Sequence, residues 1–453
     1  MRQTGNQNVM NNIGDGPDEM GNSLSYVDIG TDVARSICTG IEHACAIVND
    51  GDVRCWGSNW SGQLGNEGDT SRIYVNLGEN EKAKRISCNN RHTCVVLFND
   101  QVKCWGDNTY GQLGLGTSAG AGSIAGSMGS NLPYVDLGTG LTAKRIVSGS
   151  NHNCALLSND KVKCWGDNSN GQAGNSLQQS SPSQGSQPGQ MGDNLLYVGA
   201  DGNDLIAKSI TSGSDHICAL LLDGSVKCWG ANVRGQLGIE DPVDSVRTPS
   251  LVPVGTDNAM VSAGAYSTCV IVKGTVQRLK CWGQCIVGTC DEVGKWFGEI
   301  SSLAYIPMDA SDSVSSVTIG GAGGSPHACV LMSSNKMKCF GSNTYGKLGY
   351  GTSVEAMRNL EQQPPVDLGT VSCAAEDTSV VCKGCPMPTF WLASASSCAT
   401  CQVGNYYVDD QTSCTQCQNG KNSVPDVYAD ELYPSSTCPV DVPLSEPRPR
   451  TQG

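Results

Sequence analysis

Short apolar runs separated by polar turns recur along most of the chain. In CAIVNDGDVRC, the apolar residues 45–48 are followed by the turn Asn49-Asp50-Gly51 and then by a second run. A run, a turn and another run are typical of a β-hairpin, because Asn, Asp and Gly tolerate the backbone angles of tight turns. Runs such as CALLL at 218–222 have the length of a strand and fall short of the roughly 20 residues that span a bilayer. The pattern predicts an all-β protein with no membrane insertion.

The hairpin pattern is a repeat. A unit roughly of the form H-x-C-x9-C-W-G-x-N-x3-G-Q-L-G has five copies and a weaker sixth copy. The copies contain the cysteine pairs Cys45/Cys55, Cys94/Cys104, Cys154/Cys164, Cys218/Cys228, Cys329/Cys339 and, in the weaker copy, Cys269/Cys281. Glycine- and serine-rich insertions vary the period from 49 to 64 residues. Repeats of this length are typical of proteins whose units stack on their neighbours.

The spacing of the paired cysteines predicts their function. Nine residues separate the two cysteines in five of the copies, and an odd number places both residues opposite each other across a hairpin. Opposite residues of an antiparallel pair approach to about 4.5 Å between Cα atoms, which a disulfide can bridge. The sequence therefore predicts one disulfide across each hairpin.

Composition and charge indicate which cellular compartment and which classes of partner the sequence favours. The chain has 24 cysteines, an even number that is typical of an oxidising compartment. The net charge is −14 and the basic residues are scattered singly, which excludes a clustered phosphate-binding surface for nucleic acid. The first 30 residues contain no apolar signal-peptide core, so we expect a leader to have been removed or a longer chain to precede Met1.

All five histidines occupy the same repeat position, two residues before the first hairpin cysteine; they are His43, His92, His152, His216 and His327. His-x-Cys on one strand face could in principle hold zinc, but five identical three-ligand sites would be unusual. We expect the imidazoles to bond the backbone between strands. Because no histidine lies outside this repeat, a Ser-His-Asp or Cys-His set lacks its base. The sequence predicts a non-enzymatic protein with no catalytic, cofactor-binding or metal-binding residue.

The repeat H-x-C-A-L-x-x-D-G-x-V-K-C-W-G-x-N-x-x-G-Q-L-G resembles that of the regulator-of-chromosome-condensation family, over residues 12 to about 383. The resemblance implies a seven-bladed β-propeller. Residues 9–30 are similar to the second half of a unit, and 372–384 to a first half. We therefore expect a seventh blade shared between the two ends, with a disulfide between Cys373 and Cys382. The cysteine pairs and acidic charge depart from nuclear members and argue against nucleotide exchange on a nuclear GTPase.

After the propeller, C-x2-C pairs recur every 16 residues, at Cys382/Cys385, Cys398/Cys401 and Cys414/Cys417. This resembles the extracellular ephrin-receptor-like cysteine-rich module, and a zinc ribbon is the alternative. We expect a propeller over 1–383, the module over 384–440 and a flexible tail over 441–453. The remaining cysteines can be paired as Cys385–Cys398, Cys401–Cys414, Cys417–Cys438, Cys285–Cys290 and Cys38–Cys88. The last pair is expected because both cysteines hold equivalent positions before consecutive hairpins.

These observations predict a secreted structural or adhesive protein, a disulfide-stapled scaffold that assembles with itself or with matrix partners as an oligomer or polymer, for example in a surface or filamentous appendage. The alternative is a binding module that holds a soluble protein or a glycan on one propeller face. Asn59 begins the sequon Asn59-Trp60-Ser61 and is a candidate for glycosylation. Trp296 and Phe297 are candidates for contact with a partner.

Overall fold

The structure is a computed structural model. It describes residues 13–69, 71–177, 181–199, 204–239, 243–284, 303–308, 312–321, 325–353, 360–361 and 363–369, and the backbone of four short strands between 389 and 416. The chain divides into two compact units, residues 1–367 and 368–453. In the second unit, β21 (Thr389–Leu392) pairs with β22 (Ser397–Thr400), and β23 (Asn405–Tyr406) pairs with β24 (Thr415–Gln416).

The described part of the first unit contains six antiparallel sheets of three or four strands, numbered here in chain order. Sheet 1 consists of β1 (Ala34–Thr39), β2 (His43–Val48) and β3 (Asp52–Gly57), and sheet 2 of β4 (Ala83–Asn89), β5 (His92–Leu97) and β6 (Val102–Gly106). Sheet 3 consists of β7 (Ala143–Ser148), β8 (His152–Leu157), β9 (Val162–Asp167) and β10 (Ser183–Gln184). Sheet 4 consists of β11 (Ala207–Ser212), β12 (His216–Leu221), β13 (Val226–Ala231) and β14 (Ser245–Val252).

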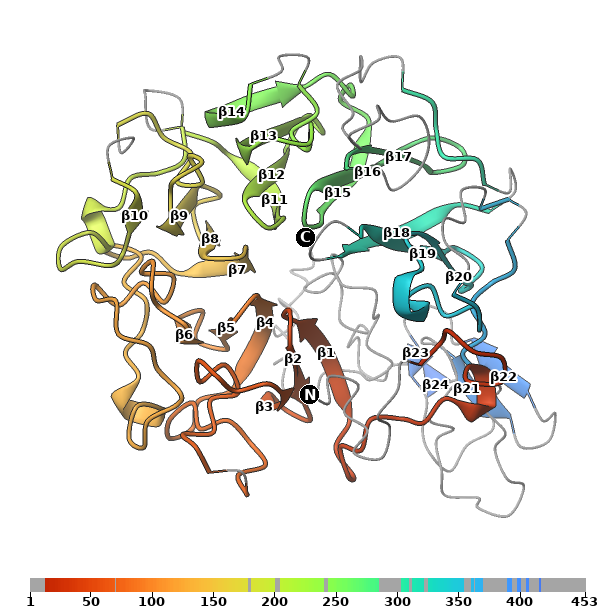
Figure 1. The fold of residues 1–453 in the computed structure, drawn as a ribbon, viewed down its shortest axis with the longest axis horizontal. Helices are drawn as coiled ribbons and strands as arrows, with labels where there is room; N and C mark the ends of the chain where they lie inside the picture. Colours follow the sequence, from red (N-terminus) through yellow and green to blue (C-terminus); the bar gives the residue numbers. More distant parts are fainter. Residues whose placement is uncertain are drawn as a thin grey trace, which may run out of the picture. The chain divides into compact units, whose positions relative to one another are not determined.

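Sheet 5 consists of β15 (Asn258–Ala263), β16 (Ser267–Val272) and β17 (Arg278–Gly283), and sheet 6 of β18 (Val314–Gly320), β19 (His327–Met332) and β20 (Met337–Gly341). In Figure 1 the six sheets follow one another around a ring in the order of the sequence, with the first strand of each sheet nearest the centre. The first strands of consecutive sheets contact each other, as β1 contacts β4 and β4 contacts β7. The arrangement is all-β, as the hairpin pattern predicts, and propeller-like, as the family resemblance implies.

The middle strands carry most of the core. Every residue of β2, β5 and β8 is buried. Sheets 2 to 5 each have a described sheet on both faces, which covers their middle strands. The tryptophan that follows the second hairpin cysteine is also buried, with 0–3% exposure at Trp105, Trp165, Trp229 and Trp282. Burying a large apolar side chain of this kind contributes roughly 1.5–3 kcal/mol. The repeat therefore places a buried tryptophan in each of sheets 2 to 5, and Phe340 holds the same position in sheet 6.

Two of the connections between sheets contain a 3-10 helix that contacts an earlier part of the ring. In the 3-10 helix η2 (Gly129–Asn131), Gly129 N–H donates to Asn76 O (3.0 Å), in the segment that borders β3 of sheet 1. The 3-10 helix η3 (Gly192–Asn194) bonds sheet 2 in the same way, through Gly192 N–H and Asp136 O (3.0 Å).

The N-terminal segment makes the same contact with the last sheet. In the 3-10 helix η1 (Gly21–Ser23), Gly21 N–H donates to Asp367 O (3.0 Å), in the segment that borders β20. A fourth 3-10 helix, η4 (Thr344–Gly346), lies in the loop after β20. Residues at the beginning of the chain thus contact sheet 6 as a following repeat unit would.

Candidate functional site

The hairpin cysteines are joined across the second and third strands of each sheet. Disulfides link Cys45–Cys55, Cys94–Cys104, Cys154–Cys164, Cys218–Cys228, Cys269–Cys281 and Cys329–Cys339, with Cα atoms 4.0–4.1 Å apart. In each pair the two residues are direct partners in the strand register, as in Cys45 opposite Cys55. None of the described cysteines is a free thiol.

A seventh disulfide joins two sheets. Cys38 of β1 and Cys88 of β4 are bonded, with Cα atoms 5.3 Å apart. The expectation that they hold equivalent positions is wrong by one residue, because Cys38 lies opposite Cys45 whereas the residue opposite Cys94 is Ser87. Neighbouring sheets face each other with this one-residue offset. One sheet further on, the equivalent residues are Ser87 and Ser148, and Ser148 N–H donates to Ser87 Oγ (3.0 Å). The disulfide therefore replaces a hydroxyl-to-backbone hydrogen bond.

The histidines connect each sheet to the next. His43 Nε2 lies 3.0 Å from Thr93 Oγ1, His92 Nε2 3.1 Å from Asn153 Oδ1, and His216 Nε2 2.9 Å from Thr268 Oγ1. The partner in these three pairs follows the histidine position of the next repeat. The third histidine differs because Ile217 holds that position, and His152 Nε2 lies 3.0 Å from Ser212 Oγ instead. In these four imidazoles Nε2 thus reaches a side chain of the next sheet rather than the expected backbone group.

Side chains that contact the histidines also contact the preceding repeat, at the main-chain carbonyl of the glutamine in its G-Q-L-G motif. Thr93 Oγ1 donates to Gln63 O (3.2 Å), and Trp105 Nε1 donates to the same carbonyl (3.0 Å). Thr268 and Trp282 share Gln236 O in the same arrangement (2.8 and 3.1 Å). Since the threonine hydrogen is used by the carbonyl, the threonine oxygen must accept from the imidazole. Each of these interfaces is therefore closed by one imidazole, one threonine, one loop carbonyl and one indole.

Burial keeps these imidazoles neutral. Desolvation lowers the pKa of His43 and His92 to about 4, and that of His152 and His216 to about 3. Repulsion between neighbouring imidazoles lowers the pKa of His43 and His152 further. A neutral imidazole suits a structural hydrogen bond, and an imidazole with so low a pKa is a poor general acid at neutral pH.

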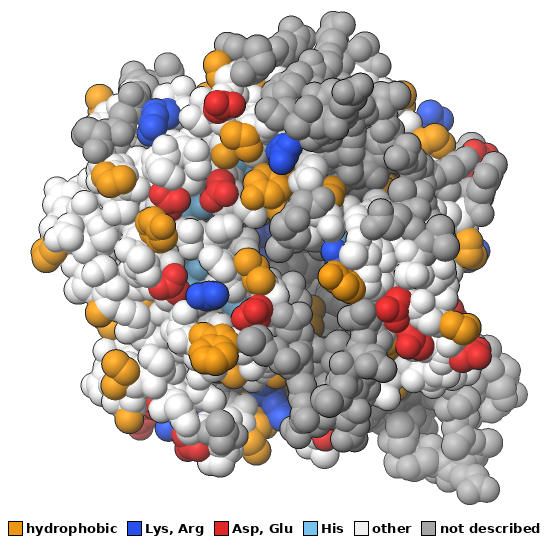
Figure 2. Space-filling model, in the orientation of Figure 1, with side chains coloured by type: hydrophobic (Ala, Val, Ile, Leu, Met, Phe, Trp, Pro, Cys, Tyr) orange, Lys and Arg blue, Asp and Glu red, His pale blue; other side chains and the backbone are white. Residues whose placement is uncertain are grey.

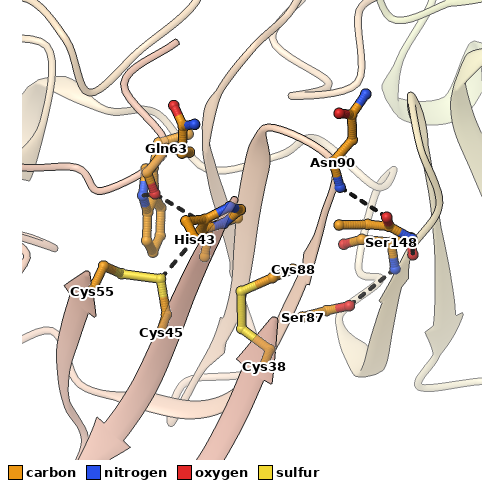
Figure 3. Close-up of a disulfide and its surroundings, with 12 residues drawn as sticks. Cys38, His43, Cys45, Cys55, Gln63, Ser87, Cys88, Asn90 and Ser148 are labelled. Carbon is orange, nitrogen blue, oxygen red and sulfur yellow. Dashed lines mark hydrogen bonds between the residues drawn. A yellow bond between two sulfur atoms is a disulfide. The ribbon is translucent and has the colours of Figure 1, made fainter. Parts of the chain in front are cut away.

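One group in the described part of the chain has the residue types of a metal site. The ligand atoms of His43, Cys45 and Cys88 all lie within 4.8 Å of one another. Figure 3 shows His43 beside the Cys45–Cys55 and Cys38–Cys88 disulfides. Both cysteines are oxidised, and a disulfide sulfur is not the thiolate that zinc requires. In this state the group is a pair of structural disulfides.

A cavity of about 420 Å³ opens between the 27–29 segment and the 64–75 loop. Trp56 and Tyr74 line it, together with the polar side chains of Asn66 and Arg72. Arg72 Nη1 lies 2.6 Å from Glu67 Oε2, so its charge is already paired. Aromatic side chains beside a few polar groups are typical of ligand-binding pockets.

Several predicted sites can be placed only in part. Asn59, the glycosylation candidate, donates from Nδ2 to Asn66 Oδ1 (2.7 Å) and accepts from Leu64 N–H (2.9 Å). The partner-contact candidates Trp296 and Phe297 lie outside the described residues, as do the cysteines 285, 290, 373, 382 and 385. The predicted tail disulfides also involve residues whose side chains are not described.

The surface in Figure 2 shows hydrophobic, acidic and basic side chains of the described residues as separate groups rather than one continuous patch. Only small areas of imidazole are visible on this face, in agreement with 0–2% exposure at His43, His92, His152 and His216. No helix among the described residues is long and apolar enough to cross a bilayer.

Comparison with known proteins identifies the repeat. The "Regulator of chromosome condensation (RCC1) repeat" profile matches residues 34–63, 83–112, 143–172, 207–236 and 321–347, and a second profile of this repeat matches 223–271. The first four matches begin at the first residue of β1, β4, β7 and β11. The chain therefore carries RCC1-type repeats, as the resemblance implied.

Two relatives illustrate the range of proteins with similar sequence. The chain is 30% identical to the human protein "Probable E3 ubiquitin-protein ligase HERC6" over 250 residues, which are 54% of this chain and 23% of that protein. It is 25% identical to "Ultraviolet-B receptor UVR8" of Arabidopsis thaliana over 354 residues, 76% of this chain and 74% of the receptor. The match therefore spans only a small part of the ligase.

Solved structures show the same fold at low identity. Human WBSCR16 superposes with a TM-score of 0.57 at 20% identity, over 75% of this chain and 85% of that one. Yeast RCC1 (Prp20), in its structure bound to Kap60, also gives a TM-score of 0.57, at 16% identity over 73% of this chain and 75% of that one. These likenesses establish the fold class of the first unit.

Proposed function

We propose that this protein is an extracellular interaction scaffold, a disulfide-stapled propeller that assembles with itself or with other extracellular proteins. The observation that carries the proposal is the oxidation state of the described cysteines, which form six disulfides within sheets and one between sheets. Disulfides in this number persist in oxidising compartments and are rare in the cytosol. A covalently stapled repeat fold suits a long-lived structural protein.

We also propose that the ring has seven blades, with the last one shared between residues 9–30 and 372–384. The hydrogen bond from Gly21 to Asp367 repeats the bonds from Gly129 to Asn76 and from Gly192 to Asp136. A blade completed by both ends would leave no free sheet edge, which limits unwanted pairing with other chains.

The region after the propeller belongs to the same proposal. Residues 384–440 form an ephrin-receptor-like cysteine-rich module, and 441–453 a flexible tail, with disulfides Cys385–Cys398, Cys401–Cys414 and Cys417–Cys438. The first unit would add Cys373–Cys382 and the local Cys285–Cys290 loop. A segment with so few aliphatic residues needs covalent staples to hold a fold.

The repeat family favours binding over catalysis. Relatives with this repeat include a light receptor, and yeast Prp20 has been solved bound to Kap60. Ligase activity is named for HERC6, of which the match covers 23%. The proposed protein has no catalytic activity, and its partners are proteins, with Trp296 and Phe297 as candidate contacts and a glycan on Asn59.

Sedimentation of the intact oxidised protein over a range of concentration and salt tests the scaffold proposal. We expect association with itself that persists in about 1 M salt, because contacts between uncharged loops are little affected by screening. A monomer at every concentration, together with an absence of the protein from extracellular fractions of its source, would remove the proposal.

The alternative is a module that binds a soluble protein or a glycan. The cavity lined by Trp56, Tyr74, Asn66 and Arg72 favours it, because sugars stack on aromatic rings and bond planar polar groups. A glycan array distinguishes the two functions. Binding that disappears in a Tyr74→Ala variant while the protein stays monomeric would favour the alternative.

A further inference from the structure

Four sulfur atoms and one imidazole meet at the boundary between sheets 1 and 2. Cys38, Cys45 and Cys55 are direct partners across β1, β2 and β3, so their side chains lie in one row on one face of sheet 1. His43 precedes Cys45 by two residues on β2 and therefore shares that face. Cys88 of β4 approaches the row from sheet 2 and is bonded to Cys38.

Among the described sheets this combination occurs once. The other hairpins provide a histidine and a cysteine pair at most, and the position of Cys38 is held by Ser87, Val147, Thr211, Ser262 and Thr318. In the next sheets the position of Cys88 is held by Ser148, Ser212, Ala263 and Ile319. Among the described sheets, cysteine thus holds both positions at one interface only.

We propose that this cluster is a redox-linked site for a thiophilic divalent cation, with Zn²⁺ bound by His43, Cys45, Cys88 and one of the released thiols, Cys38 or Cys55, when both disulfides are reduced. Tetrahedral zinc has bonds of about 2.0–2.3 Å, so its ligand atoms lie roughly 3.5 Å apart. The atoms of His43, Cys45 and Cys88 lie within 4.8 Å of one another before any rearrangement. Contraction by about 1 Å converts the group into a coordination sphere.

The surroundings favour a bound cation of this kind. His43 is 2% exposed, so its imidazole is shielded from solvent beside the cysteine sulfurs. Cys45 has no exposure, and Cys38, Cys55 and Cys88 are partly buried against the same core. A Cys3His donor set on two adjacent sheets would hold the interface as the disulfide does.

Conversion of the oxidised cluster to the zinc-bound cluster requires reduction of both disulfides and then loss of thiol protons. Each disulfide takes two electrons and two protons from one dithiol reductant, which closes to its own disulfide, and four protein thiols result. Three of these thiols lose their protons to solvent as they bind the cation, and His43 binds through a lone pair. Oxidation by a disulfide oxidant reverses both steps and releases the cation. The site therefore exchanges one zinc ion for two disulfides.

Cobalt uptake by the full-length chain tests this proposal. The protein is reduced anaerobically with a phosphine, separated from the reductant and titrated with Co²⁺, and thiolate–cobalt absorption and metal content are measured. We expect the Cys88→Ser variant to bind one equivalent less than the unaltered chain, whatever the tail cysteines bind. Cys154→Ser, at the position equivalent to Cys45 in sheet 3, should lose none, and the oxidised protein should bind none at the cluster. Equal uptake by Cys88→Ser and the unaltered chain would overturn the proposal.

Alkylation of the reduced unaltered chain gives a second measurement that does not depend on a variant. With Zn²⁺ present, Cys45 and Cys88 should be labelled at least tenfold more slowly than without it, whereas Cys154 and Cys164 should be labelled at the same rate in both conditions. Labelling of Cys45 and Cys88 that does not respond to zinc would contradict the site.

Discussion

At the scale of single residues, the histidines act as connectors between sheets. Each of four buried imidazoles reaches a side chain of the following sheet, and in three cases that side chain shares a loop carbonyl with a tryptophan. A glycine three residues earlier makes room for the ring at three of these positions, since a Cβ on Gly40, Gly149 or Gly213 would lie 2.0–2.3 Å from an imidazole carbon. The spacing G-x-x-H is the sequence signal for this contact.

This arrangement predicts loss of stability in mild acid. The four imidazoles have pKa values of about 3–4 when folded, against 6.5 in the unfolded chain, so the unfolded chain binds more protons below pH 6.5. The unfolding free energy should be constant above that pH, fall from 6.5 to about 4, and lose up to about 1.4 kcal/mol per pH unit for each histidine. Denaturant titrations at pH 7, 6 and 5 measure this slope.

A His92→Gln variant is the control for that slope. It should reduce the pH dependence by about one proton, because glutamine keeps an amide donor and does not titrate in this range. Asp215 acts in the opposite direction, since burial and repulsion by Asp167 raise its pKa to about 6, but it is one group against four. An unfolding free energy that is the same at pH 7 and pH 5 would contradict the buried neutral imidazoles.

At the scale of the structural element, the repeat predicts the strands within each sheet better than it predicts the contacts between neighbouring sheets. The hairpin pattern and the cysteine spacing predict strands with opposed cysteines, because both depend on residues about ten positions apart. The histidine partners could not be predicted, since they depend on the register between sheets some 50–60 residues apart in sequence. The same cause explains the one-residue error in relating Cys38 to Cys88.

The glycine loops that pack beneath the tryptophans allow a quantitative test. Gly114 has a φ of +67°, and a Cβ there would lie 2.9 Å from Trp165 Nε1. Gly140 has a similar φ of +70°, but a Cβ there would meet nothing within 4 Å. We expect Gly140→Ala to cost about 1–2 kcal/mol through backbone strain alone. Gly114→Ala should cost about 1–3 kcal/mol more, because the interface is overpacked. Equal losses in denaturant midpoints would show that the tryptophan contact is not tight.

At the scale of the whole molecule, the first unit is a series of sheets in which each sheet packs against the next one. Sequence predicts the repeat and the class of fold, and the contact of η1 with the segment bordering β20 supports the closure proposed above. The blade count rests on residues beyond the described range, so closure is best tested through the described contact. Gly21 and Gly129 are the matched positions for that test.

A Cβ on Gly21 would lie 2.4 Å from Asp367 Oδ2, and one on Gly129 would lie 2.7 Å from Asn76 Nδ2, with φ values of +65° and +69°. If the N-terminal segment closes the ring, Gly21→Ala and Gly129→Ala should lower the unfolding free energy by similar amounts, about 1–3 kcal/mol each. Thermal and denaturant unfolding of both variants provide the comparison. A cost for Gly129→Ala with none for Gly21→Ala would show that the N-terminal contact does not stabilise the ring.

The central claim is that the sheets are stapled by disulfides in the protein's own environment, and peptide mapping of native material tests it most directly. Protein collected from its source is alkylated without reductant, digested and examined by mass spectrometry under non-reducing conditions. The account predicts linked peptides for the six hairpin pairs and for Cys38–Cys88, with few alkylated thiols. Alkylation of most of these cysteines in folded native protein would contradict it.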